Sequence, residues 1–163
     1  MGTRSGDIDP SVIFFLEENG FSVSDIKNIL NKESGMKGLI GENDMRAINQ
    51  MANDGNEDAE LALEIYAYRI KKYIGAYAAA MNGLDAIVFT AGVGENDAQT
   101  RARVCEEMNY LGIEINSTKN EARKNGTREI QKGNTKILVI PTNEELEIAN
   151  QSYKVINQKR SYL

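Results

Sequence analysis

The sequence predicts an α/β fold in which helices flank a small parallel or mixed sheet. Two short apolar runs, Ala86–Phe89 and Lys136–Ile140, are rich in β-branched residues, as expected for strands that are covered on both faces. A long helical pattern over residues 58–82 leads into the first run, and a helical pattern follows each run. This alternation is typical of a parallel or mixed sheet. Because only two or three strands are convincing, the chain is expected to be part of a larger fold.

The composition limits the classes of protein to which the chain can belong. With 163 residues, 41% hydrophobic and 26% charged, it has the size and balance of one soluble domain. The net charge of −5 gives no sign of a nucleic-acid or membrane partner, and no apolar run is long enough to cross a membrane. The absence of histidine excludes histidine-dependent triads and most zinc sites. The single Cys105 cannot form an internal disulfide, so a cytoplasmic location is expected.

Residues 1–57 predict a helical region. Its helices are expected to begin after three capping signals, which are Asp9 followed by proline, Ser22 followed three residues later by Asp25, and Asp44. The glycine-bearing stretch 31–44 is expected to be a loop.

Residues 58–163 predict an α/β core. The helix at 58–82 carries apolar residues at helical spacing and is expected to end at Asn82 and Gly83; these apolar residues are Leu63, Ala67, Ile70, Ile74, Tyr77 and Met81. A helix over about 97–111 is expected to end at Gly112, followed by a short strand at 113–116. The polar stretch 116–136 predicts surface loops and a minor strand around 128–130. Thr142 and Glu145 predict a capping box for the last helix.

The stretch Asp85–Asn96 carries the strongest sign of a ligand site. It is expected to be a buried strand, a tight turn at Gly92 and Gly94, and then a helix that starts after Asn96. The N–H groups of that helix would face a phosphate or another polar group of a nucleotide. The alternative is a connection in which the glycines serve geometry alone.

Three further positions carry candidate chemistry. Glu144 follows the second strand, and if the two strands lie side by side or one apart, it comes within reach of the same ligand as Asn96. Its carboxylate suits Mg²⁺, or it compensates the dipole of the following helix. Arg4 and the segment Asp44–Arg46 offer donors for phosphate, with a solvated arginine and an ordinary helix cap as the alternatives.

Five motifs resemble the C-terminal part of the acetate kinase family, in the family's order and almost end to end. They are GTRSGDIDP, LNKESGMKGLIG, NDMRAI, YRIKKYIGAYAAAMNGLDAIVFTAGVGEN and VIPTNEELEIA. The resemblance implies a ribonuclease H-like domain of the actin and sugar kinase superfamily. It also implies Mg²⁺-dependent transfer of the γ-phosphoryl group of ATP to acetate, giving acetyl phosphate and ADP, by a homodimer. The chain would then be the C-terminal portion of domain two, with a helical subregion 1–57 and an α/β core 58–163.

The same resemblance implies a role for each candidate residue. Arg4 would stabilise the transition state of phosphoryl transfer, and Glu144 would be associated with Mg²⁺. The residues implied to contact the nucleotide are Asp44, Met45, Arg46, Gly92, Val93, Gly94, Glu95 and Asn96.

The N-terminal half of the family, with its remaining catalytic groups, has no counterpart in this sequence. The chain is therefore expected to be a truncated piece that is inactive alone. The alternatives are a propionate or other short-chain acyl kinase and a non-catalytic dimerisation fragment. A dinucleotide-binding oxidoreductase is disfavoured, because Asp97 stands where the third glycine of GxGxxG is required.

Overall fold

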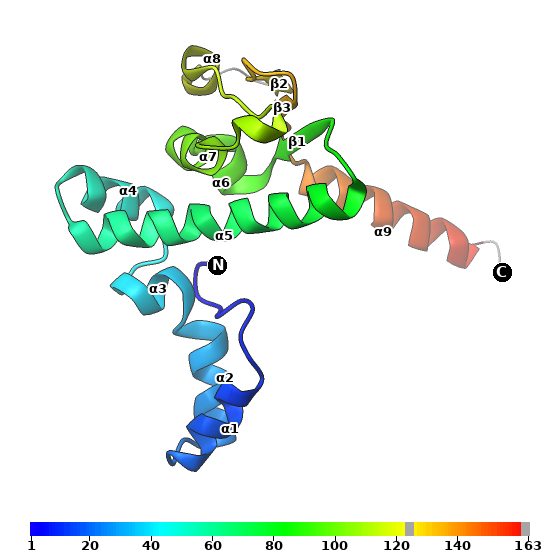
Figure 1. The fold of residues 1–163 in the computed structure, drawn as a ribbon. Helices are drawn as coiled ribbons and strands as arrows, with labels where there is room; N and C mark the ends of the chain where they lie inside the picture. The colour runs from blue at the N-terminus through cyan, green and yellow to red at the C-terminus, as the bar shows by residue number, and fades with distance from the viewer. Residues whose placement is uncertain (123–125, 161–163) are drawn as a thin grey trace. The chain divides into compact units, whose positions relative to one another are not determined.

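The computed structural model describes residues 1–122 and 126–160, and the side chains as far as residue 157. The chain divides into two compact units, Met1–Gly83 and Leu84–Leu163, and each is described by itself (Figure 1). The first compact unit extends to Gly83, because the long helix that precedes this residue packs with the helices before it. None of the helices in the described part of the chain has the length and hydropathy of a membrane-spanning segment.

The first unit is helical, as the sequence predicts. Its elements are α1 (Ser11–Glu18), α2 (Val23–Lys32), α3 (Gly35–Ile40), α4 (Met45–Asn53) and α5 (Glu57–Met81). The capping box at α2 is confirmed, because the Ser22 hydroxyl accepts the Asp25 N–H while the Asp25 carboxylate accepts the Ser22 N–H. The end of α5 is also confirmed, since Asn82 takes the left-handed conformation directly after it. At α1 the Asp9 carboxylate accepts the Ser11 N–H at 2.8 Å, although the helix starts one residue later than expected.

The stretch 31–44 is not simply a loop, because it contains α3. The N–H groups at the start of this helix find partners in the first residues of the chain. The amides of Met36 and Lys37 donate to the carbonyl oxygens of Met1 and Gly2 at 3.0 and 2.9 Å. These long-range bonds satisfy N–H groups that an isolated short helix leaves without partners. The sequence pattern of this stretch alone did not reveal them.

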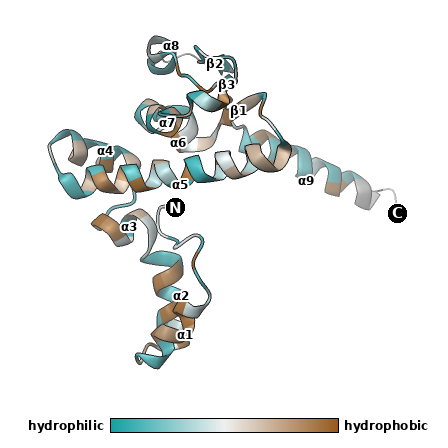
Figure 2. Cartoon of the chain, viewed as in Figure 1, coloured by the Kyte–Doolittle hydropathy of each residue, from teal (hydrophilic) through white to brown (hydrophobic). Residues whose placement is uncertain are grey.

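The core of the first unit lies between α3, α4 and the first half of α5. Its buried members are Met36, Ile48, Ala59, Ala62 and Leu63. The second half of α5 does not bury all of its predicted apolar face, because Tyr77 and Met81 are 60% and 63% exposed. All residues of α1 are at least partly exposed, and Figure 2 shows that much of this helix is hydrophobic.

The second unit contains a mixed sheet of three strands in the order β1-β3-β2. Its elements are β1 (Ala86–Phe89), α6 (Ala91–Asn96), α7 (Ala98–Cys105), the 3-10 helix η1 (Asn109–Leu111), α8 (Ser117–Glu121), β2 (Arg128–Glu129), β3 (Lys136–Val139) and α9 (Glu144–Arg160). Strands β1 and β3 are parallel, with Ala86 opposite Lys136 and Phe89 opposite Val139, and β2 is antiparallel to β3. The small mixed sheet and the minor strand around residue 128 are thus confirmed.

Several local expectations for the second unit are wrong. The helix expected over 97–111 ends at Cys105, because Glu106 is extended and Glu107 has a φ of +55°. Gly112 still ends the following 3-10 turn in the left-handed conformation. Residues 113–116 form one isolated bridge, Ile115 with Gln131, and not a strand.

Two further differences concern the polar stretch and the first strand. The stretch 116–136 contains the short helix α8, which Asn116 caps, and its residues 123–125 lie outside the described residues. Strand β1 is not covered on both faces, because Val88 is 52% exposed whereas Ile87 is buried.

Replacing Gly35 by alanine is expected to lower the free energy of unfolding more than replacing Gly41 by alanine. Both glycines have a positive φ, +61° and +76°, so a side chain strains the backbone at each by about 1–2 kcal/mol. A Cβ at Gly35 would also lie 2.4 Å from the Met1 carbonyl oxygen, whereas no described atom lies within 4 Å at Gly41. This overlap costs a further ~1–3 kcal/mol. Urea unfolding of both variants measures the difference, and an equal loss would contradict the prediction.

Candidate functional site

The carboxyl ends of β1 and β3 lie next to each other at one edge of the sheet. The last pair of the ladder is Phe89 with Val139, and beyond it the Ile140 amide donates to the Phe89 carbonyl oxygen at 2.9 Å. The Thr90 hydroxyl then donates to the Ile140 carbonyl oxygen at 2.8 Å. The two strands therefore lie side by side, which is one of the arrangements that the sequence analysis expected. The segments that follow them leave the sheet together, where parallel sheets bind their ligands.

The glycine segment after β1 is itself a helix and not a turn, so this expectation is wrong. The residue that turns the chain is Ala91, with a φ of +59°, while Gly92 and Gly94 have no positive φ. The two glycines instead differ in what surrounds them. A Cβ at Gly94 would lie 3.1 Å from the Phe89 carbonyl carbon, so α6 packs closely against β1 there. No described atom lies within 4 Å of a Cβ at Gly92, which leaves its backbone open to a ligand.

The polar side chains of α6, Asn96 and Glu95, form hydrogen bonds with other groups of the chain. The Asn96 amide donates to the Gly92 carbonyl oxygen at 2.9 Å, and Val93 is half-buried. One oxygen of the Glu95 carboxylate, Oε1, accepts both the backbone N–H and the hydroxyl of Thr142, at 2.8 and 2.9 Å. These two bonds hold the pKa of Glu95 below its ordinary value. Glu95 therefore ties α6 to the segment that follows β3.

This contact corrects the expected capping box at the start of α9. The Thr142 hydroxyl bonds to Glu95 and not to the helix. The cap is Asn143, whose side-chain oxygen accepts the Leu146 N–H at 3.0 Å.

Glu144 is the first residue of α9 and is exposed. Within the described part of the chain its carboxylate makes no hydrogen bond or ion pair. Two more acidic residues, Glu145 and Glu147, share the first turn, so both the dipole and the metal interpretation stay open. Among the side chains that the structure describes, no three or more His, Cys, Asp or Glu residues are clustered so that they could hold a metal ion.

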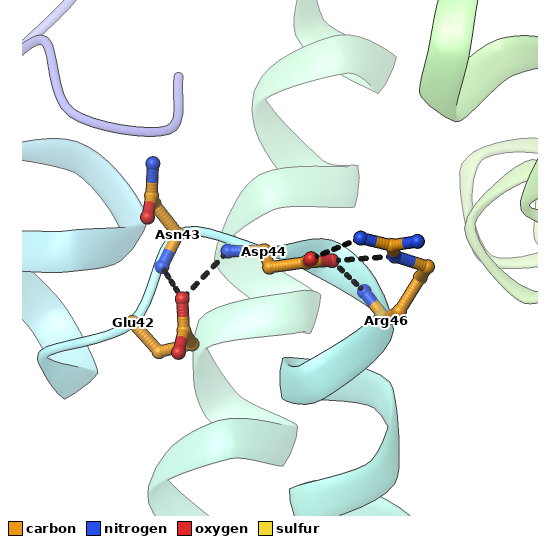
Figure 3. A network of polar contacts seen from close by, with 4 residues as sticks. All are labelled: Glu42, Asn43, Asp44 and Arg46. Atoms are coloured by element: carbon orange, nitrogen blue, oxygen red, sulfur yellow. Dashed lines mark hydrogen bonds and ion pairs between the residues drawn. The ribbon is translucent and has the colours of Figure 1, made fainter.

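In the first unit, Asp44 and Arg46 form a two-bond ion pair at the start of α4 (Figure 3). Arg46 Nε donates to Asp44 Oδ1 at 3.0 Å, and Arg46 Nη2 donates to Asp44 Oδ2 at 2.5 Å. The Asp44 carboxylate also accepts the Arg46 backbone N–H at 2.9 Å, which confirms it as the cap of α4. These bonds lower the pKa of Asp44 to about 2. Met45 is half-buried against the core of the unit.

Arg4 lies in the first unit, in a segment that is fixed by backbone hydrogen bonds. The Ser5 amide donates to the Leu30 carbonyl oxygen at 2.9 Å, and the Ser34 amide donates to the Thr3 carbonyl oxygen at 2.9 Å. The Arg4 side chain is exposed and makes no hydrogen bond or ion pair with other described residues. Its guanidinium is thus presented on an anchored backbone, as an anion-binding arginine requires.

The sequence analysis missed three residues that hold α6 in place, namely Arg101, Asn120 and Arg128. Arg101 donates to the carbonyl oxygens of Gly94 and Glu95, and Arg128 donates to that of Glu95. The available signal was the position of Arg101 on the apolar face of its helix, three residues before Val104 and four before Cys105. A charged residue at such a position is buried with partners.

Comparison with known proteins gives one consistent result. The model of the acetokinase family matches residues 1–150. The acetate kinase of Flavobacterium johnsoniae is 54% identical over 159 residues, which are 96% of this chain and 40% of that protein. The crystal structure of Porphyromonas gingivalis acetate kinase superposes with a TM-score of 0.86 at 46% identity, covering 96% of this chain and 40% of that one. A propionate kinase from Francisella tularensis superposes with a TM-score of 0.84 at 46% identity, covering 91% and 38%. The chain thus spans about 40% of the length of these relatives.

We expect the Asp44 carboxyl group to titrate at a pH of about 2, because the protonated form would lose its bonds to Arg46. Replacing Arg46 by methionine should raise this pKa towards its ordinary value of 3.8. Since the pKa is lower in the folded than in the unfolded state, the stabilisation is present above a pH of about 4 and is lost as the pH falls through about 2. An NMR titration of the carboxyl carbons measures both values.

Asp25 provides the control for this titration. Its pKa is lowered by Ser22 and should not change in the Arg46→Met variant. An unchanged titration midpoint of Asp44 in that variant would mean that Arg46 does not cause the shift.

Proposed function

This chain belongs to the acetokinase family, and we propose that it forms part of a kinase that transfers the γ-phosphoryl group of ATP to acetate, giving acetyl phosphate and ADP. The observation that carries the proposal is the match to acetate kinases along 96% of the chain. Because the chain spans about 40% of the relatives' length, the activity proposed is that of the longer protein. A homodimer and a cytoplasmic location are parts of the same proposal.

We assign the nucleotide to the edge of the sheet where β1 and β3 end. The open backbone at Gly92 admits a ligand, and Val93, Gly94, Glu95 and Asn96 complete the segment that receives it. The tie between Glu95 and Thr142 makes this edge one connected surface. Asp44, Met45 and Arg46 remain proposed nucleotide-contacting residues of the first unit, where Asp44 and Arg46 form the charged pair at the start of α4.

The donor set beside this edge fits Mg²⁺. Magnesium takes one or two protein carboxylates together with phosphate oxygens and water. Glu144 offers a carboxylate that has no partner among the described residues, directly after the segment that bonds to Glu95. When bound, the ion would neutralise charge on the phosphate oxygens. The proposed role of Glu144 is to hold the magnesium ion at the edge of the sheet.

We assign to Arg4 the binding of the phosphoryl group while it is transferred. The transition state spreads negative charge over the equatorial oxygens, and an arginine supplies donors that match this geometry. The anchored backbone and the uncommitted guanidinium of Arg4 suit this role, because positioning carries most of the catalysis in phosphoryl transfer.

A propionate kinase is the second candidate function. The Francisella tularensis propionate kinase and the Porphyromonas gingivalis acetate kinase are each 46% identical to this chain. The two acids differ by one methylene, which a hydrophobic pocket discriminates by only about 1–3 kcal/mol. The deciding measurement is kcat/KM for acetate and for propionate with the longer protein that contains this chain. A preference for propionate would replace the first proposal.

Replacing Arg4 by alanine is expected to lower kcat for acetyl phosphate formation by about 10³-fold or more, because a cation at the transition state is lost. The measurement uses a hybrid enzyme in which this chain replaces the matching stretch of the Flavobacterium johnsoniae acetate kinase. Lys32→Ala is the control, since Lys32 is an exposed cation of the same unit. A near-normal rate for Arg4→Ala would contradict the assigned role. The 163-residue chain on its own is expected to form no acetyl phosphate.

Replacing Glu144 by glutamine is expected to raise the Mg²⁺ concentration for half-maximal activity of the hybrid by at least about tenfold, because a metal-holding carboxylate is lost. Glu145→Gln is a matched control that removes the same charge from the same helical turn. Titration of activity with MgCl₂ measures both variants. Equal responses of the two would assign Glu144 to the helix dipole and not to the metal.

A further inference from the structure

Arg101 is a buried cation whose role the proposed function does not explain. The residue lies on α7 and is 2% exposed. Its guanidinium donates four hydrogen bonds, and all four go to carbonyl or amide oxygens of neutral groups. A buried charge is costly unless its N–H donors are hydrogen-bonded, so the four acceptor oxygens must stay in position around Arg101.

Two of these bonds hold the backbone of α6. Arg101 Nη1 donates to the carbonyl oxygens of Gly94 and Glu95 at 2.8 and 3.0 Å. They belong to the last turn of α6, where carbonyl groups lack helical partners and a positive charge is favourable. Arg128 Nη2 from β2 donates to the same Glu95 oxygen at 3.2 Å. Burial and the charge of Arg128 lower the pKa of Arg101, and Asp97 acts in the opposite direction.

The other two bonds fix the orientation of the guanidinium. Arg101 Nε donates to the Asn120 side-chain oxygen at 2.7 Å, and Nη2 donates to the Asn120 carbonyl oxygen at 2.8 Å. Asn120 is itself 4% exposed, and its amide donates to the Ala98 carbonyl oxygen at 2.8 Å. Because the guanidinium is planar and Asn120 holds Nε and Nη2, the two N–H groups of Nη1 have a fixed direction. That direction is the end of α6.

Glu95 links the backbone that Arg101 holds to the segment after β3. The backbone of Glu95 is held by Arg101, and its carboxylate accepts the N–H and hydroxyl of Thr142. Thr142 stands two residues before Glu144. One buried side chain therefore connects the glycine segment with the start of α9.

We infer that Arg101, oriented by Asn120, is a positioning residue that fixes the α6 backbone for the nucleotide and, through Glu95, sets the segment that carries Glu144. The inference rests on the proposed function for the identity of the ligand. The positioning itself concerns residues of this chain and is measurable without catalysis.

The first experiment measures kinetic constants in the hybrid enzyme with Arg101→Met and Arg101→Lys. The methionine variant removes all four hydrogen bonds and should raise KM for ATP at least about tenfold, while KM for acetate stays within about twofold. Lysine keeps the charge without the planar fork and should give an intermediate KM for ATP. Val104→Ala is the control, because Val104 is a buried apolar residue of the same helix whose side chain donates no hydrogen bond, and it should leave both KM values unchanged.

The second experiment measures amide hydrogen exchange in the 163-residue chain by NMR. The Thr142 amide donates to Glu95 and should exchange at least about tenfold faster in Arg101→Lys than in the parent chain. The Ile130 amide donates to Ile137 within the sheet and reports the stability of the whole unit. In Val104→Ala the two amides should accelerate together, whereas in Arg101→Lys the Thr142 amide should accelerate more.

Each result supports or overturns the inference. If the variants keep the parent KM for ATP and the Thr142 amide keeps its rate relative to Ile130, the positioning role is wrong. If Arg101→Met does not fold, the lysine variant and the exchange ratio decide. An inactive parent hybrid together with selective acceleration at Thr142 would overturn the proposed function but support the positioning role.

Discussion

The parallel pairing of β1 with β3 is the constraint on which the second unit depends. Parallel strands cannot be joined by a tight turn, so the 46 residues from Thr90 to Thr135 must cross over between them. On β3, burial of the Ile137 and Val139 side chains, which are at most 1% exposed, stabilises the sheet. With the two strands in register, the segments that follow them must begin at the same edge. The relation between α6 and α9 is a consequence of this pairing.

The crossover is held to the sheet by polar contacts as well as by apolar packing. Its apolar members, such as Val104 and Ile113, are fully buried. Arg101 and Asn120 are also buried; Arg101 donates to backbone oxygens of α6, and Asn120 donates to a backbone oxygen of α7. Apolar contacts tolerate small shifts, whereas a satisfied buried guanidinium accepts only one arrangement of its partners. The polar cluster therefore defines the position of α6, and the apolar core supplies most of the stability of the unit.

Local chemistry explains which parts of the fold the sequence predicts. The capping box of Ser22 and Asp25, the cap at Asp44 and the two apolar strands depend on neighbouring residues, and the structure contains all of them. Features that depend on distant partners were not predictable in the same way. Helix α3 relies on carbonyl groups of the first residues, and the Thr142 hydroxyl bonds to Glu95 and not to its own helix. The glycines of α6 suggested a turn, but Gly94 is needed for close packing against β1. Arg101 was visible only as a charge on an apolar face.

The two acidic side chains beside the sheet edge differ in a way that separates their roles. Glu95 has one carboxylate oxygen engaged by two donors of Thr142, and its pKa is lowered by these bonds. A cation that drew this carboxylate away would break the link between the two segments that form the edge. Glu144 has no such link within the described residues, so a cation can bind it without disturbing the fold. Under the proposed function, Glu144 would therefore hold the metal ion and Glu95 would keep the edge together.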